Sequence, residues 1–137
     1  MSRVDLRSDT LTLPTDEMRE AMAAAEVGDD VYGEDPTVDH LEEIAAEQVG
    51  MEAALYVPSG AMGNTCAMLS HAHHGEEVIF EERAHMFVWE CGAFANIAGL
   101  ASRTLTGSNG IIQPDQLREA IRGHNVHFSP TSLVCIE

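Results

Sequence analysis

Two stretches near the start of the chain carry apolar residues at the spacing of an α-helix. In residues 16–25 the apolar positions recur at intervals of three and four, which places them on one helical face. A second run begins after Pro36 and Thr37 and ends at Gly50, because glycine is favoured just past the end of a helix. The pattern predicts helices over residues 16–25 and 36–49, joined by the polar loop 28–35 (GDDVYGED).

Beyond residue 52 the pattern changes to short, continuous apolar runs, which are typical of strands buried on both faces. These runs are residues 53–57 (AALYV), 78–80 (VIF), 101–105 (ASRTL, the weakest) and 133–136 (LVCI). Helical patterns separate them at residues 60–73 and 114–122. This alternation predicts an α/β fold with a mainly parallel sheet flanked by helices. Such a sheet binds ligands beyond the carboxyl ends of its strands.

The last predicted strand is followed directly by Glu137, the final residue of the sequence. A chain seldom stops on a newly formed strand with no element after it. We therefore expect the sequence to be the N-terminal part of a longer protein, with a sheet that is incomplete at the C-terminus. The alternative is a genuine short C-terminal strand.

The charge balance is strongly acidic, with 23 acidic residues, seven basic residues and a formal net charge of −16. Every basic residue is arginine, and no position is lysine. Such a surface repels nucleic acid and anionic lipid, so neither is expected as a partner. We expect adaptation to high salt, since screening reduces the self-repulsion of the chain. The alternative is a GC-rich genome that prefers arginine codons.

Other features narrow the class of protein further. No apolar run approaches the ~18 residues that a membrane-spanning helix needs, and the start of the chain lacks the apolar core of a signal peptide. We therefore expect a cytoplasmic protein. The three cysteines are odd in number and form no C-x-x-C pair, so we expect reduced, mostly buried thiols and no zinc ribbon.

The turn at residues 59–64 (SGAMGN) joins a predicted strand to a predicted helix. Its glycines allow tight turning and a close approach of the backbone to a ligand. A helix that begins there directs free N–H groups at whatever lies beyond the sheet, which is how proteins bind phosphate. The turn is a phosphate cradle without a P-loop lysine, or a purely structural turn.

The histidines and the acidic loop are the other candidates for chemistry. His85 follows the strand 78–80 and should lie on the ligand-binding edge of the sheet, where it is either functional or packed. His127 precedes the last strand and is unremarkable by itself. The cluster at residues 71–74 suits the negative end of a helix dipole better than a metal, because no further ligands follow at helical spacing. The loop 29–36 lacks the spacing of a calcium loop. No metal site is expected.

Several of these segments occur together in one order. They are DLRSDT at residues 5–10, VGDDVYGEDPT at 27–37, EAALYVPSGAMGN at 52–64, ERAH at 82–85, and a histidine before LVCIE at 133–137. The combination resembles the low-specificity L-threonine aldolases, which belong to the β-eliminating lyase group of fold type I enzymes. The resemblance implies pyridoxal 5′-phosphate as cofactor and an aspartate aminotransferase-like fold. Residues 1–35 would form an N-terminal arm, helix and interface loop, and residues 36–137 the N-terminal part of the large, cofactor-binding domain.

The resemblance also implies roles for particular residues. Backbone N–H groups of Gly60 and Ala61 would hold the cofactor phosphate, although many members of the family carry threonine at the Ala61 position. His85 would stack on the pyridine ring, and His127 would lie near the substrate hydroxyl. Either histidine is a candidate base, since imidazole titrates near neutrality.

Two further residues are implied to contact the substrate, and one to support the site. Ser8 would contact the substrate carboxylate, and Tyr32 would reach the site of a neighbouring subunit in a homo-oligomer. Glu90 follows His85 by about one helical turn and either orients it or is a solvated carboxylate.

The function implied is cleavage of L-threonine or L-allo-threonine to glycine and acetaldehyde. The family's Schiff-base lysine cannot lie in a chain without lysine, so we expect this chain alone to be inactive. One alternative is another β-eliminating lyase of the same fold type. A second is a non-catalytic remnant, or a partner subunit, that binds phosphate compounds.

Overall fold

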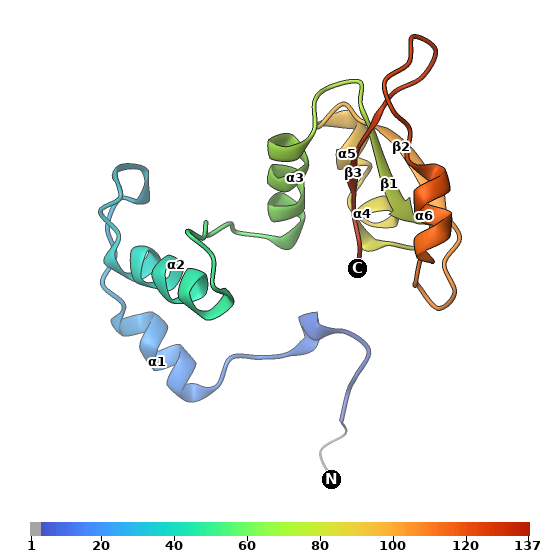
Figure 1. Cartoon of the computed structure of the whole chain (residues 1–137). Helices are drawn as coiled ribbons and strands as arrows, with labels where there is room; N and C mark the ends of the chain where they lie inside the picture. The colour runs from blue at the N-terminus through green and yellow to red at the C-terminus, as the bar shows by residue number, and fades with distance from the viewer. Residues whose placement is uncertain (1–3) are drawn as a thin grey trace. The chain divides into compact units, whose positions relative to one another are not determined.

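The computed structural model describes residues 4–137 and divides the chain into two units, Met1–Tyr56 and Val57–Glu137 (Figure 1). The first three residues of the predicted N-terminal arm lie outside the described residues. The first unit contains the 3-10 turns η1 (Asp9–Leu11) and η2 (Asp30–Tyr32) and the helices α1 (Asp16–Ala24) and α2 (Pro36–Val49). Both predicted helices of this unit are confirmed, and α1 ends one residue earlier than its pattern predicts.

Local caps explain where α2 begins and ends. The carboxylate of Asp35 accepts hydrogen bonds from the backbone N–H groups of Thr37 and Val38, both at 3.0 Å. Pro36 occupies the first turn, where a missing N–H has no cost. Gly50 ends the helix in the left-handed conformation with φ of 67°. Sequence-local signals are therefore sufficient to set both ends of this helix.

The predicted strand at residues 53–57 is wrong, because the structure shows no strand there. A strand requires a neighbour for its ladder of hydrogen bonds, and this segment pairs with no other segment among the described residues. The backbone N–H of Tyr56 donates instead to Oε1 of Glu42 at 2.6 Å. The apolar composition of the segment was not sufficient to form a strand.

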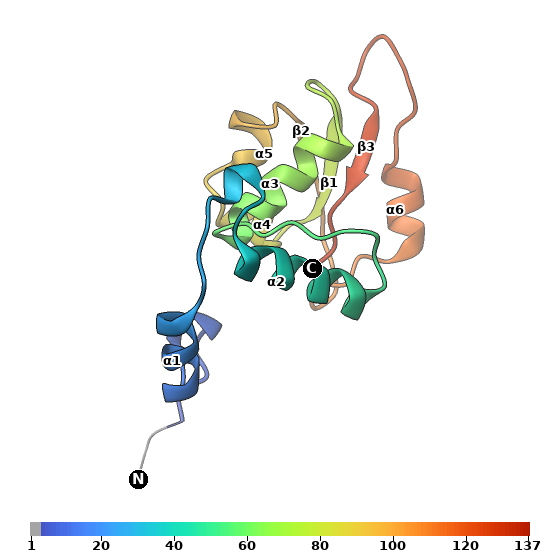
Figure 2. The ribbon, with the colours of Figure 1, turned by 90° about the vertical axis from the view of Figure 1, so that its left-hand side faces the viewer.

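The second unit is a parallel sheet with helices on both faces, as the sequence predicts, and it has three strands rather than the four expected. Its helices are α3 (Gly60–His71), α4 (His85–Val88), α5 (Ala93–Asn96) and α6 (Pro114–Ala120), and its strands are β1 (Glu77–Glu81), β2 (Ala101–Leu105) and β3 (Thr131–Val134). The strand order is β2-β1-β3, and β1 is parallel to both neighbours. Figure 2 shows α3 and α5 on one side of the sheet and α6 on the other.

Some boundaries in this unit differ from the prediction. Helix α3 stops at His71 rather than residue 73, and α6 at Ala120 rather than 122. Strand β3 starts at Thr131, two residues before the apolar run, because the ladder to β1 pairs Glu77 with Thr131. Pairing with a neighbouring strand, rather than hydrophobicity, sets where a strand begins. The short helices α4 and α5 were not predicted.

The core of this unit lies between β1 and the helices α3, α4 and α5. Val78 and Phe80 alternate onto one face of β1 and are fully buried. They pack with Met68 and Leu100 and with the aromatic residues of the short helices. The rings of Phe80, Phe87 and Phe94 lie 5.3–5.8 Å apart between centroids. Burial on this face holds α4 and α5 against the strand, although each is only one turn long.

The cysteines differ in part from the expectation. All three are free, but only Cys66 and Cys135 are partly buried, and Cys91 is exposed. Cys91 has a left-handed backbone with φ of 54° at the tight turn into α5, which holds its side chain at the surface. Within residues 4–137, no helix has the length and apolar content needed to span a bilayer.

Candidate functional site

The carboxyl ends of the three strands meet at one edge of the sheet, because all three are parallel. His85 opens α4 only four residues after the end of β1, so it lies at this edge. A short connection leads from the end of α3 to the start of β1, so the helix runs antiparallel to the strand. The beginning of α3, with Gly60 and Ala61, is consequently directed toward the same edge.

The first turn of α3 offers unpaired backbone donors. Oγ of Ser59 accepts from the backbone N–H of Met62 at 3.2 Å, and its carbonyl accepts from Gly63 at 3.1 Å. Helical geometry leaves the N–H groups of Gly60 and Ala61 without partners inside the helix. A Cβ built on Gly60 meets no atom within 4 Å, and Ala61 is exposed. A ligand can therefore approach this backbone closely.

Three side chains from α3, α4 and the segment after α4 form a polar chain at the same edge. The amide of Asn64 donates to Oε1 of Glu90 at 2.7 Å, and Nδ1 of His85 lies 3.0 Å from the same oxygen. The Glu90 side chain is 2% exposed and that of His85 58% exposed. The second oxygen of Glu90, Oε2, is buried without a partner among the described residues. A buried carboxylate thus supports an accessible imidazole.

A cavity of about 270 Å³ lies beside this chain of side chains. It is lined by Asn64, Ala84, His85, Met86, Cys135, Ile136 and Glu137. The backbone N–H of His85 donates to Oε2 of Glu137 at 2.5 Å, which ties α4 to the segment after β3. Burial raises the pKa of the Cys135 thiol, and the nearby charge of Glu90 raises it further. Cys135 is therefore a neutral thiol in this wall at neutral pH.

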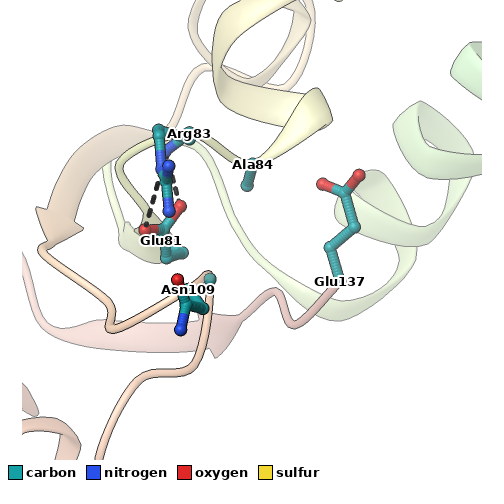
Figure 3. A pocket seen from close by; sticks show the side chains of 6 residues that line it. Glu81, Arg83, Ala84, Asn109 and Glu137 are labelled. Atoms are coloured by element: carbon teal, nitrogen blue, oxygen red, sulfur yellow. Dashed lines mark hydrogen bonds and ion pairs between the residues drawn. The ribbon is translucent and has the colours of Figure 1, made fainter.

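A second cavity of about 310 Å³ shares Ala84 and Glu137 with the first. Figure 3 shows Glu81, Arg83 and Asn109 around it, with Glu137 on the other side. The buried Glu81 carboxylate accepts from the backbone N–H groups of Arg83 at 2.6 Å and Gly107 at 3.2 Å. These bonds hold together the loops that follow β1 and β2. Glu81 therefore shapes the edge of the sheet, and its oxygens are already engaged.

His127 lies elsewhere in the same unit. It occupies a tight turn closed by the bridge between Asn125 and Phe128, and its backbone N–H donates to Oδ1 of Asn125 at 2.9 Å. The turn precedes β3 and so lies at the amino edge of the sheet, as Figure 1 shows. The structure does not bring His127 together with His85. Its contact with the substrate hydroxyl stays a prediction.

Ser8 and Tyr32 belong to the first unit and make only local contacts there. Oγ of Ser8 accepts from the backbone N–H of Thr10 at 3.2 Å and caps η1. Tyr32 ends η2 and is 77% exposed. The loop that carries it is closed at its base, where the backbone N–H of Gly28 donates to Oδ2 of Asp35 at 3.0 Å. The roles of both residues toward the substrate stay predictions.

Sequence reasoning missed Asn64 and Glu137. Asn64 lies one helical turn after Gly60, so its position inside the strand-to-helix turn was the available signal. Glu137 follows a strand at its carboxyl end, the position that drew attention to His85. The three histidines near the end of α3 are not part of this site. The His74 ring packs against Gly99, and residues 4–137 contain no group of three or more potential metal ligands.

Comparisons with known proteins agree with one another. The family model described as beta-eliminating lyase matches residues 5–137. The chain is 42% identical to a low specificity L-threonine aldolase of Escherichia coli over 98% of its own length and 40% of the relative. It is 45% identical to low-specificity L-threonine aldolase 1 of Arabidopsis thaliana, covering 100% of the chain and 39% of the relative. An uncharacterized protein of Caenorhabditis elegans is 47% identical over 98% of the chain and 33% of the relative. The chain thus spans between a third and two-fifths of the length of these relatives.

Proposed function

The chain belongs to the beta-eliminating lyase family, and from that premise we propose that it serves a pyridoxal phosphate-dependent carbon–carbon lyase acting on β-hydroxy amino acids. L-threonine and L-allo-threonine are the proposed substrates, with glycine and acetaldehyde as products. The observation that supports this most directly is the pairing of two features at one edge of the sheet. These are the free N-terminus of α3 and the exposed imidazole of His85.

The residues present fit the cofactor. When bound, pyridoxal phosphate supplies an electron sink for the bond that breaks. The unpaired N–H groups of Gly60 and Ala61 suit a phosphate, and the helix dipole adds to the attraction. The space around Gly60 leaves room for it. Ala61 offers no hydroxyl, so phosphate binding depends here on backbone donors.

His85 has two proposed tasks. Its face is accessible for stacking on an aromatic ring, since more than half of the side chain is exposed. Its ring nitrogen can also accept the proton of a substrate hydroxyl, which is the step that begins cleavage of the Cα–Cβ bond. His127 is the other candidate for this proton. Because His127 lies at the amino edge of the sheet, that role requires another part of the protein, such as a second subunit, to bring the two together.

A chain without lysine has no side-chain amine for a covalent bond to the cofactor. We therefore propose that residues 1–137 contribute binding and proton handling, and that they do not turn over substrate by themselves. The expected homo-oligomer, cytoplasmic location and adaptation to high salt stay predictions.

Binding of pyridoxine 5′-phosphate to the chain tests the cradle, because this analogue has no aldehyde and reports non-covalent binding only. Gly60→Pro removes one N–H donor at a helical position that tolerates proline, and the extended backbone of Ser59 suits a following proline. Gly60→Ala is the matched control, since it keeps the donor and its methyl group meets no atom within 4 Å. We expect Gly60→Pro to weaken binding about tenfold and Gly60→Ala to leave it within about twofold, as loss of one charge-assisted hydrogen bond implies.

Two results would contradict the proposal. Equal binding of pyridoxine and pyridoxine 5′-phosphate to the wild-type chain would show that nothing in it recognises phosphate. For the complete protein, failure to release acetaldehyde from L-threonine would exclude the proposed reaction. Release of pyruvate and ammonia from serine instead would identify a different lyase of the same fold.

A further inference from the structure

We propose that Glu90, anchored by Asn64, is a positioning residue that holds the His85 imidazole in one tautomer, with Nδ1 protonated and Nε2 free as an acceptor. The hydrogen bonds that support this inference involve no cofactor atom. The use of the free Nε2 as a base rests on the proposed function. Its basis is the contact of both Asn64 and His85 with a single oxygen, Oε1 of Glu90.

The chemistry of the three groups determines which of them donates and which accepts in each hydrogen bond. The amide nitrogen of Asn64 is only a donor, so Oε1 of Glu90 acts as an acceptor toward it at 2.7 Å. At 3.0 Å, Nδ1 of His85 needs a hydrogen between itself and the same oxygen. That hydrogen belongs to Nδ1, because a carboxylate accepting from Asn64 has none to give. In the neutral ring Nε2 is then unprotonated.

Burial makes this arrangement selective. With 2% of its side chain exposed, Glu90 has little water to solvate it, and a buried carboxylate is costly unless donors surround it. Asn64 and His85 are its donors among the described residues, and Oε2 has none. In the other tautomer the proton is on Nε2, and the lone pair of Nδ1 would face the lone pairs of the carboxylate oxygen. The pair is therefore more stable with Nδ1 protonated.

The consequence for the site is chemical. His85 lines the cavity and more than half of its side chain is exposed, so in the proposed tautomer a hydroxyl in the cavity can donate to Nε2. If Nε2 takes a proton from a hydroxyl, the O–H bond breaks, an N–H bond forms and the ring becomes positively charged. The carboxylate of Glu90, 3.0 Å from Nδ1, stabilises that charge. An accessible imidazole on a buried acceptor is thus suited to act as a base rather than as a donor.

Ring ¹⁵N NMR on the histidine-labelled chain measures the tautomer directly. The measurement is made at about pH 8.5, where ordinary imidazoles are neutral, and His85→Asn assigns the signals. We expect a protonated-type shift for Nδ1 and an unprotonated-type shift for Nε2 in the wild type. In Glu90→Leu we expect a change to the Nε2–H form that predominates for histidine in water. Glu119→Leu, at an exposed position on α6, removes the same charge and should leave the His85 signals unchanged.

A second variant separates positioning from simple packing. Asn64→Leu leaves the carboxylate in place but removes its anchor, so the Nδ1–H form should remain the major one with a measurably smaller share. Predominance of the Nε2–H form in the wild type would overturn the proposal, even if Glu90→Leu fails to fold. Retention of the Nδ1–H form in a folded Glu90→Leu chain would overturn it as well. Neither result bears on phosphate binding, which the Gly60 variants test separately.

Discussion

Oε2 of Glu77 accepts a hydrogen bond from Nη1 of Arg122 at 3.2 Å, across 45 residues of sequence. The same carboxylate lies 3.2 Å from Nε of Arg103 and accepts from Oγ1 of Thr131 at 2.8 Å. Its side chain is 5% exposed. One buried carboxylate thus joins β1, β2, β3 and the segment after α6 at the amino edge of the sheet. The role of Glu77 is structural, and the residue lies at the opposite edge of the sheet from His85.

Replacing this carboxylate should lower the stability of the second unit. We expect Glu77→Gln to reduce the free energy of unfolding by about 2–3 kcal/mol, because two arginines lose charge-assisted hydrogen bonds. Urea unfolding followed by tryptophan fluorescence measures the change. Arg122→Met and the double variant complete a cycle that isolates the coupling of the pair. Glu119→Gln is the exposed control, and a similar small effect of both glutamate substitutions would show that the cluster contributes little.

Gly99 is required by its backbone and by its neighbour. It has φ of +66°, and a Cβ at this position would lie 2.0 Å from the ring of His74. We expect Gly99→Ala to destabilise the second unit by about 2–4 kcal/mol, from both a steric clash and left-handed strain. In a His74→Ala background the clash disappears, and the cost should fall to the ~1–2 kcal/mol of strain. Thermal melts of the four chains test this, and an unchanged cost in the second background would argue against the contact.

Asp35 should make the first unit sensitive to acid. Hydrogen bonds from the backbone N–H groups of Gly28 and Val38 lower the pKa of the Asp35 carboxyl below its ordinary value. A carboxyl with a lowered pKa in the folded state stabilises that state above the pKa of the unfolded chain. This stabilisation is lost as the pH falls through the lower, folded-state pKa.

The Gly28 amide resonance should therefore be shifted at pH 7 and move toward random-coil values only in acid, as the pH falls through the lowered pKa of Asp35. Asp35→Asn should be less stable than the wild type at pH 7, with the difference shrinking in acid. Asp30→Asn, at an exposed position of the same loop, serves as the control. A stability difference between Asp35→Asn and the wild type that is independent of pH would show that the ionised carboxylate of Asp35 is not the source of the stabilisation.

Stability should rise with salt, because the net charge of −16 opposes folding and counterions shorten the range of the repulsion. We expect the melting temperature to increase from low salt to molar potassium chloride. A parallel series in sulfate separates screening from general salting-out. A melting temperature that does not change over the chloride series would rule out adaptation to high salt.

Borohydride treatment with pyridoxal phosphate should leave every side chain unlabelled, since the chain has no lysine. Peptide mass spectrometry after reduction checks this, with a lysine-containing protein treated in parallel. A stable adduct on any side chain within residues 1–137 would show that another group serves as the covalent anchor.

Sequence patterns predicted the parts of the fold that depend on local signals. The periodicity and caps of α1 and α2, and the apolar run of β1, were sufficient to locate these elements. The run at residues 53–57 was equally apolar, but a strand also needs a partner, which composition does not report. The two runs therefore differ in a tertiary contact, the pairing with a neighbouring strand, which only the run of β1 makes.

The same limit applies to the candidate site. The position of His85 after β1 was readable from the order of elements, and its distance of five residues from Glu90 suggested an interaction. The contact of Asn64 with Glu90 spans 26 residues and depends on how α3 packs beside the sheet. For His127 the order of elements and the resemblance point to different places. Its position before β3 puts it at the amino edge of the sheet, whereas its proximity to a substrate was inferred from the resemblance alone.

The strand order β2-β1-β3 has a consequence for synthesis on the ribosome. β1 is the central strand, yet its neighbour β3 begins 54 residues later in the chain, as the bond between Glu77 and Thr131 records. At translation rates of roughly 5–20 residues per second, one side of β1 stays unpaired for about 3–10 s after it leaves the ribosome. During this interval one edge of β1 leaves its backbone N–H and C=O groups unpaired, next to the apolar side chains of Val78, Ile79 and Phe80. This is where chaperones would be expected to bind the nascent chain.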